Sequence, residues 1–222
     1  GEITLDGVLD EPAWLDAPVA SHFIQNDPRE GEPATFDTEV RVLYDDEALY
    51  VAFHAYESDP SARTRTMLRY RWDSIWQLDD VVRFAIDTFH DHRNGFYFST
   101  NPLAALKDAN TVENGRTINY DWNIVWENET SVDDRGWYVE IAIPFSQLRF
   151  SPDSLQTWGL QIWRYVDSSN EQVMWAFRGR NEAGRETGNI TFRLWNAEGA
   201  PLGSLKTDKD IELARRMEKL RG

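Results

Sequence analysis

Ten tryptophans are the most conspicuous chemical feature of this 222-residue chain, in which aromatic residues make up 13%. The flat face of an indole can stack on the apolar C–H surface of a pyranose ring, while polar neighbours fix the sugar hydroxyls. Most of the ten indoles must fill a hydrophobic core, because Trp is largely buried in globular domains. The indoles that the core does not need are candidates for ligand recognition.

Other catalytic or metal-binding patterns are weak or absent. His90, Asp91 and His92 carry zinc-ligand groups, but no third ligand follows at a suitable spacing, so we do not predict zinc. The chain contains no GxSxG, HExxH or P-loop motif, and it has no cysteine for a thiolate nucleophile, a thiolate metal site or a disulfide. The sequence also cannot pair two carboxylates for glycoside hydrolysis. We therefore expect a binding module and not an enzyme.

The charge of the chain restricts its partners. Thirty-eight acidic residues against 23 basic ones give a net charge of −15, which repels nucleic acids and anionic membrane surfaces. Such a surface suits a neutral ligand such as a sugar, or a cation. No stretch approaches the ~20 apolar residues of a transmembrane helix. The chain opens without Met on a predicted strand, Ile3-Thr4-Leu5, so we expect that a signal sequence was removed and that the protein is periplasmic or extracellular.

Most of the chain alternates between apolar and polar residues with a period of two, which is typical of half-buried strands. Short segments of this kind, separated by turn residues, predict an all-β fold, an antiparallel jelly-roll β-sandwich. Gly95 is expected to supply a positive φ in the turn that precedes one of these strands. The predicted strands cover residues 38–44, 48–56, 80–88, 96–100, 105–113, 122–126, 129–133, 136–144, 158–166, 172–178 and 189–195.

The C-terminal stretch has a different pattern. Residues 206–221 place Ile211, Ala214 and Met217 at helical spacing, with Thr207 as a plausible N-cap. We therefore predict a sandwich domain over residues 1–200, and a linker with a short amphipathic C-terminal helix over residues 201–222. This helix either packs on its own sandwich or docks onto another chain.

Several blocks of the sequence together resemble carbohydrate-binding module family 9. These are ITLDGVLDEPAW (3–14), EVRVLYDDEALYVAFHAYESDP (39–60), DDVVRFAIDT (79–88) and GWYVEIAIPFSQL (136–148). A closer resemblance is to the version of this module at the N-terminus of uncharacterised outer-membrane β-barrel proteins. Its marks are IDTFHDHRNGFYFSTNP (86–102), YDWNIVWE (120–127), IPFSQLRF (143–150) and WGLQIWRYV (158–166). The resemblance implies a jelly-roll fold with a sugar-binding or docking role.

The resemblance also implies a ligand site. Family 9 modules hold a terminal sugar between two Trp residues; Trp76 is a better positional match than Trp72 for the first, and Trp175 matches the second. Asn181 lies in the loop beyond Trp175, together with Glu182. Sugar-binding members carry an acidic acceptor in the strand after the first Trp, whereas this chain has Arg83 or Val82 there. That departure weakens the sugar-binding interpretation.

Calcium is the second feature that the resemblance implies. A calcium site needs six to eight oxygen ligands. Carboxylates in the regions of Asp6, Glu11, Asp45 and Asp59 are the candidates for a structural calcium ion. The alternative is ordinary turn and cap chemistry, because Asp is favoured in turns.

Two functions remain open from the sequence. The first is a non-catalytic carbohydrate-binding module that works outside the cytoplasm. The second is an interaction subunit whose sandwich contacts protein subunits of a larger periplasmic or membrane-associated complex. The C-terminal helix and Arg83 favour the second, and the tryptophan content and the family resemblance favour the first.

Overall fold

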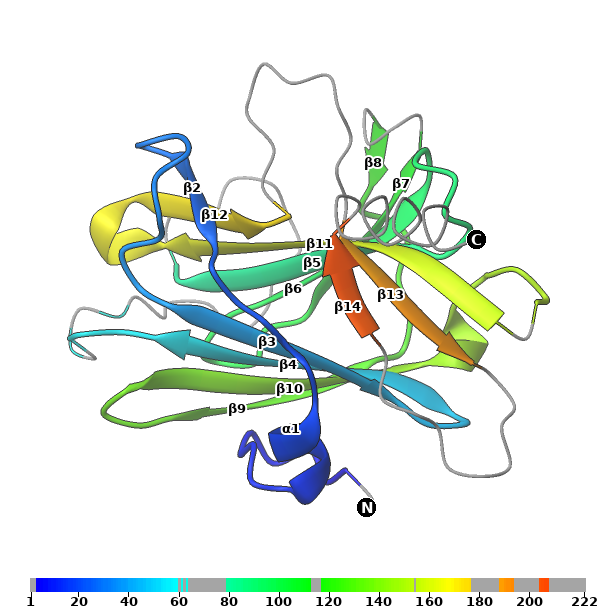
Figure 1. Cartoon of the computed structure of the whole chain (residues 1–222), viewed down its shortest axis with the longest axis horizontal. Coiled ribbons are helices and arrows are strands. Elements are labelled where there is room, and N and C mark those ends of the chain that lie inside the picture. Colours follow the sequence, from blue (N-terminus) through cyan, green and yellow to red (C-terminus); the bar gives the residue numbers. More distant parts are fainter. Residues whose placement is uncertain are drawn as a thin grey trace, which may run out of the picture.

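The computed structural model describes residues 3–59, 61, 63, 79–112, 117–153 and 155–176, together with the backbone of 188–193 and 204–207. Within these residues two antiparallel sheets stack as a sandwich, so the predicted all-β fold is confirmed (Figure 1). Sheet A has five strands, in the order β1 (Val19–Ala20), β3 (Thr38–Tyr44), β4 (Ala48–Tyr56), β10 (Gly136–Pro144) and β9 (Glu127–Val132).

Sheet B has nine strands. Seven of them lie in the order β14 (Ser204–Thr207), β13 (Gly188–Arg193), β11 (Leu155–Val166), β5 (Val81–Asp87), β6 (Gly95–Thr100), β7 (Lys107–Val112) and β8 (Thr117–Asn119). The long strand β11 pairs with β13 through its first half and, through its second half, with β12 (Glu171–Trp175), which in turn pairs with β2 (Ile24–Asp27). Three short helices complete the described elements, namely α1 (Pro12–Asp16), η3 (Phe145–Gln147) and η4 (Asp167–Ser169).

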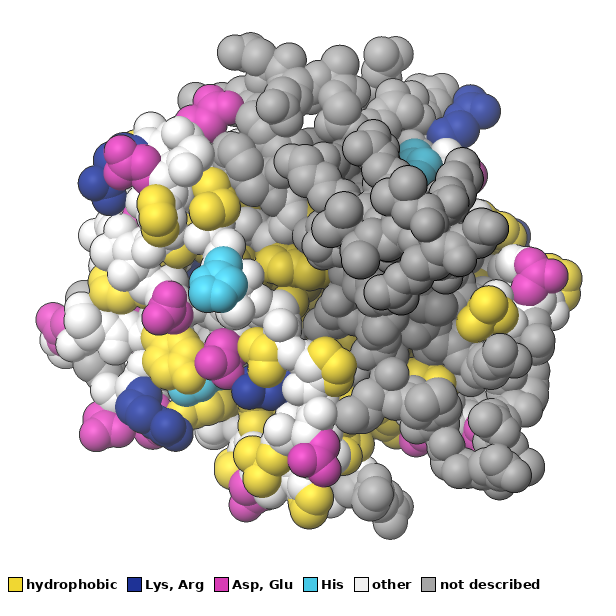
Figure 2. Space-filling model, in the orientation of Figure 1, with side chains coloured by type: hydrophobic (Ala, Val, Ile, Leu, Met, Phe, Trp, Pro, Cys, Tyr) yellow, Lys and Arg dark blue, Asp and Glu magenta, His cyan; other side chains and the backbone are white. Residues whose placement is uncertain are grey.

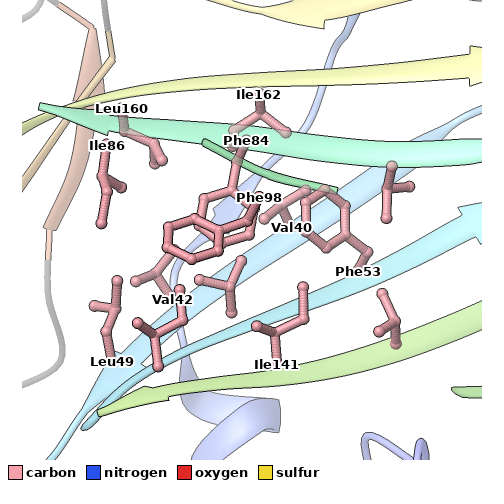
Figure 3. Packing of buried hydrophobic residues seen from close by; sticks show 14 of the residues in the cluster. Val40, Val42, Leu49, Phe53, Phe84, Ile86, Phe98, Ile141, Leu160 and Ile162 are labelled. Atoms are coloured by element: carbon pink, nitrogen blue, oxygen red, sulfur yellow. The ribbon is translucent and has the colours of Figure 1, made fainter. Parts of the chain in front are cut away.

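The hydrophobic core fills the space between the two sheets. Alternate side chains of sheet A, such as Val40, Phe53 and Ile141, point toward Phe84 and Ile162 of sheet B (Figure 3). None of the five is more than 1% exposed. The period-two alternation of these strands is therefore a direct consequence of one buried and one outer face.

A buried arginine joins the sheets at one end of this core. Arg164 of β11 is 0% exposed, and its guanidinium donates to the carbonyl oxygens of Asp37 and Tyr56 and to the hydroxyl of Thr38. Its Nη2 also lies 3.8 Å from Oε1 of Glu57. Burial lowers the pKa of Arg164 to about 10, although the charge of Glu57 acts in the opposite direction.

The N-terminal segment covers the outer face of sheet A. Trp14 of α1 packs there with Ala17, Leu43 and Ala52 in a second, smaller apolar cluster. From α1 the chain runs across to β2 at the edge of sheet B (Figure 1). The strand predicted at Ile3-Thr4-Leu5 is wrong, because these residues adopt no regular structure and Ile3 packs against the Trp14 cluster.

Other local predictions also need correction. Residues 122–126 form no strand, because Trp122 and Ile124 pack against the core from an irregular segment. Gly95 is not among the residues with positive φ; His90 and His92 adopt that conformation in this turn. A Cβ at Gly95 would instead lie 2.9 Å from the carbonyl oxygen of Ile86.

The predicted C-terminal helix does not begin at residue 206. Lys206 and Thr207 lie in β14, which pairs with β13 and so extends sheet B beyond residue 200, where we placed the domain boundary. The remainder of the predicted helix, residues 208–222, lies outside the described residues. In the part of the chain that is described, no helix is long and apolar enough to cross a membrane.

Candidate functional site

The outer face of sheet B carries polar and aromatic side chains in two neighbouring rows. In the first row Arg83 of β5 lies between Trp163 of β11 and Ser99 of β6, and Ser99 is followed by Lys107 of β7. These side chains point away from the core, because Phe84, Phe98 and Ile162 at the alternate positions point into it.

The second row lies one pleat further along the same strands. Ala85 of β5 stands between Gln161 of β11 and Tyr97 of β6. We call the residues of the two rows that carry functional groups, Arg83, Tyr97, Ser99, Lys107, Gln161 and Trp163, the sheet B face.

Charge connects the members of this face. Burial raises the pKa of the Tyr97 phenol, while the charge of Arg83 acts in the opposite direction. The Lys107 ammonium lies 4.6 Å from the centre of the Tyr120 ring, at the distance of a cation–π contact. Two cations therefore lie on this face of a strongly acidic protein.

Gln161 contributes a buried amide to this face. Its Nε2 donates to the carbonyl oxygen of Trp175 at 2.6 Å. Its Oε1 is buried and accepts no hydrogen bond from any described residue. A buried acceptor of this kind is costly unless a ligand or an ordered water supplies a donor. Gln161 therefore points to recognition of a hydroxyl or amide group.

The structure separates two of the predicted ligand residues. Arg83 lies on the outer face, but Trp175 pairs with Ile162 on the inner face, where its half-buried indole packs against the core. Trp175 therefore cannot stack on a sugar beside Arg83. The other predicted ligand residues, Trp76 and Asn181, lie outside the described residues, so the predicted clamp is not tested.

Gln161, Trp163 and Tyr97 were missed by sequence reasoning. The signal was present, because Gln161 and Trp163 alternate with Leu160 and Ile162 in the β11 sequence. Once Ile162 is assigned to the core, Gln161 and Trp163 must face outward. Cross-strand register then places them beside Arg83, and only the fold supplies that register.

The four carboxylates predicted to bind calcium mostly bind their own turns. Asp45 accepts from the backbone N–H groups of Glu47 and Ala48 and from the Tyr50 hydroxyl. Asp59 accepts from the N–H and the hydroxyl of Ser61. These contacts match the alternative of turn chemistry.

The remaining two calcium candidates lie in the N-terminal segment. Asp6 accepts from the N–H of Val8, and Glu11 accepts from the N–H of Thr4. Asp45 and Asp59 lie at opposite ends of the nine-residue strand β4, which spans about 30 Å, so they cannot share one ion. Among the described residues, no group of three or more His, Asp or Glu side chains is arranged to hold a metal. Structural calcium stays a prediction.

Comparison with known proteins identifies the family. The sequence profile described as "Carbohydrate family 9 binding domain-like" matches residues 5–189, and this chain belongs to that family. Comparison with curated proteins gave no match.

Solved structures show the same fold. A family 9 carbohydrate-binding module from Caldicellulosiruptor kristjanssonii in complex with glucose is 17% identical, with a TM-score of 0.60 over 90% of this chain and 96% of that chain. A family 9 module from the same organism in complex with cellotriose is 18% identical, with a TM-score of 0.57 over 82% of this chain and 84% of that one.

Proposed function

We propose that this chain is a non-catalytic carbohydrate-binding module that works outside the cytoplasm, and that the sheet B face contacts the sugar. The observation that carries the proposal is the cross-strand row of Trp163, Arg83 and Ser99, with the unpaired Oε1 of Gln161 one pleat away. The half-buried Trp163 ring and Arg83 guanidinium offer stacking and hydrogen bonding to a sugar ring, and the buried Ser99 hydroxyl and Gln161 amide lie beside them on the same face. Membership of the family and its glucose- and cellotriose-bound neighbours support the same function.

Arg83 changes the chemistry of recognition but does not abolish it. A carboxylate accepts hydrogen bonds from sugar hydroxyls, whereas a guanidinium donates to their oxygens. A hydroxyl group serves equally as donor and acceptor, so a sugar can turn its hydroxyl hydrogens toward Gln161 and its oxygens toward Arg83. The two residues lie on neighbouring strands and so act on one ring.

Calorimetric titration with a panel of neutral mono- and oligosaccharides tests this function. We expect binding to at least one member, and loss of at least tenfold in affinity for Trp163→Ala and for Gln161→Ala. Arg41→Gln on the outer face of sheet A is the matched control, because it removes a cation from the other sheet and should leave affinity unchanged. The proposal would be contradicted if no sugar of the panel bound, or if Arg41→Gln lowered the affinity as much as Trp163→Ala and Gln161→Ala.

The second candidate function is an interaction subunit of a membrane-associated complex. It is favoured by a cluster on the outer face of sheet A, where the His54 ring lies 3.6 Å from Tyr56 and 4.0 Å from Tyr138. Exposed Arg135 donates to the Tyr138 hydroxyl at 2.6 Å. Tyrosine and arginine are enriched where protein interfaces concentrate their binding energy.

Copurification from native membranes tests this alternative. We expect partner subunits to copurify with this chain at fixed stoichiometry. The double variant Arg135→Glu, Tyr138→Ala should no longer copurify with them. Deletion of residues 206–222 examines the C-terminal segment separately. Arg29→Glu, at an exposed turn away from the cluster, is the control. Purification of the chain alone would argue against an interaction subunit.

A further inference from the structure

A cavity of about 330 Å³ opens at one end of the sandwich, away from the sheet B face. It lies where the turn after β5 and the ends of β6 and β7 meet the last residue of η3 and the segment that follows it. We call it the end pocket. Its volume lies within the range of about 300–1,000 Å³ that is usual for small-molecule sites. The described residues that line it are Thr88, Phe89, Asn94, Gly95, Phe96, Asn110, Thr111, Val112, Trp122, Gln147 and Arg149.

Two stacked aromatic rings form an apolar wall of the end pocket. The ring centres of Phe96 and Trp122 lie 4.9 Å apart at an interplanar angle of 26°. Both side chains are half-buried and pack against the core, so their positions are fixed. Phe96 shares a face with core residue Phe98, whereas Tyr97 points to the opposite face. The end pocket and the sheet B face therefore use opposite faces of β6.

Polar groups surround this aromatic wall. Asn110 lies opposite Phe96 on β7, and its buried Oδ1 accepts no hydrogen bond from the described part of the chain. Gln147 accepts from the N–H of Val125 through Oε1, which directs its amide toward the segment next to Trp122. Primary amides beside aromatic rings bind the hydroxyl groups of sugars, because one amide group offers both a donor and an acceptor.

The charge of the end pocket is opposite to that of the protein. Arg149 is exposed at the pocket and forms no ion pair with any described residue. No Asp or Glu is among the described lining residues, although the chain carries 38 of them. A ligand with a carboxylate would pair with the Arg149 guanidinium through charge-assisted hydrogen bonds.

We propose that the end pocket is a second saccharide site, and that it takes a sugar ring with a carboxylate, of the hexuronate class. The ring stacks against the Phe96–Trp122 wall, a hydroxyl donates to Oδ1 of Asn110, and the carboxylate accepts from Arg149. This site is separate from the sheet B face and does not require that face to bind sugar.

Two-dimensional NMR of the 25.8 kDa chain tests the proposal, with glucuronate and galacturonate as probes and glucose and galactose as neutral counterparts. We expect saturable shifts of the backbone amides of Gly95, Asn110, Thr111 and Gln147 with a uronate. Arg149→Gln should weaken uronate binding about tenfold and bring it to the level of the neutral sugar. Trp122→Ala should abolish binding of both the uronate and the neutral sugar at the end pocket.

Arg149 is exposed, so we expect Arg149→Gln to keep the fold. This variant therefore tests the proposal even if Trp122→Ala fails to fold. Arg41→Gln is the matched control, because it removes a cation from the outer face of sheet A and should leave the end-pocket shifts unchanged. Absence of saturable shifts at the end pocket would overturn the proposal. So would uronate affinity that is equal in wild type and Arg149→Gln. Shifts confined to Arg83 and Gln161 would overturn the second site while supporting the sheet B face.

Discussion

Oε1 of Glu140 accepts a hydrogen bond from the indole Nε1 of Trp14 at 2.7 Å, and neither residue is exposed. The second carboxylate oxygen accepts from the backbone N–H groups of Asp6 and Gly7. One carboxylate on the outer face of sheet A therefore holds three points of the N-terminal segment. Apolar side chains of this segment are visible at the lower end of Figure 2, over α1.

Replacing Glu140 with Gln should loosen this attachment. A Gln side chain has one acceptor oxygen, so its amide hydrogens must oppose either the Trp14 indole N–H or the two backbone N–H groups. We expect Glu140→Gln to lower the free energy of unfolding by about 1–3 kcal/mol, the cost of buried donors left without acceptors. Urea unfolding measures this change.

Glu129→Gln is the matched control for Glu140→Gln. Glu129 lies directly opposite Glu140 in the β9–β10 pairing, but its side chain is exposed. We expect a change within about 0.5 kcal/mol, as for other surface substitutions. Equal losses in both variants would show that the N-terminal segment does not depend on the carboxylate of Glu140.

The lowered pKa of His54 predicts that the protein loses stability in mild acid. Burial, and secondarily the charge of Arg135, lower the pKa of this imidazole from 6.5 to about 4 in the folded state. Between pH 6.5 and 4 the unfolded chain therefore binds a proton at His54 that the folded chain does not bind. The stability that the neutral His54 contributes is fully present above pH 6.5. It is lost as the pH falls toward 4, which lowers the free energy of unfolding by about 1–3 kcal/mol.

The difference in unfolding free energy between wild type and His54→Gln, followed from pH 7 to pH 4, isolates this contribution. It should fall as the pH falls, because the variant lacks the titrating group. Added salt should leave most of the slope intact, since burial is the leading cause and salt screens only the neighbouring charges of Arg135, Glu39, Asp133 and Arg41. A difference that does not change with pH would refute the prediction.

The strands that bound the core were predictable from the sequence alone. Residues 38–44, 48–56 and 136–144 were predicted as strands and form β3, β4 and β10 with those same limits. Each places apolar residues at alternate positions, so local pattern and tertiary burial agree. The same alternation could have placed Gln161 and Trp163 on the outer face, but only the β5–β11 register shows that they are neighbours of Arg83 and Ala85.

The failures arise where a distant partner decides the local structure. Ile3 looks like part of a strand, yet it packs around Trp14 because Glu140, more than 130 residues away, holds the adjacent backbone. Lys206 and Thr207 fit a helical pattern, but they extend sheet B as partners of β13. Trp175 was predicted as a ligand residue from its positional match to the family; the structure places it on the inner face with Val173, while the predicted clamp with Trp76 stays a prediction.

Arg164 should be among the least replaceable polar residues of the described chain. Arg164→Met removes the donors to the Asp37 and Tyr56 carbonyls, and among the described ion pairs it leaves Glu57 with only the Arg63 Nε contact at 2.8 Å. We expect a loss of about 3–5 kcal/mol, because breaking a buried ionic network leaves unpaired groups. Arg164→Lys keeps the charge but not the planar set of donors, and it should recover only part of this loss. Denaturant midpoints of the two variants measure this difference. A midpoint for Arg164→Lys that is no higher than that for Arg164→Met would contradict a role for the charge.

Gly136 should tolerate no side chain, because a Cβ would collide with the neighbouring strand. A second glycine with positive φ but no such neighbour, Gly31, separates this collision from backbone strain. Gly136 begins β10 with φ +152°, and a Cβ there would lie 2.1 Å from the carbonyl oxygen of Ala55 on β4. The two residues belong to paired strands, so neither can move without breaking the ladder. Gly31, in the exposed turn after β2, also has a positive φ, +86°, but a Cβ there would have no atom within 4 Å.

Gly31→Ala therefore carries only the conformational strain of a left-handed residue, about 1–2 kcal/mol. Gly136→Ala adds a steric conflict with rigid backbone, and we expect it to cost about 2–4 kcal/mol, or to prevent folding. Thermal and urea unfolding of both variants measure the difference. If the two variants lost equal stability, backbone conformation alone would explain both, and the close approach of β10 to β4 at Gly136 would have no energetic consequence.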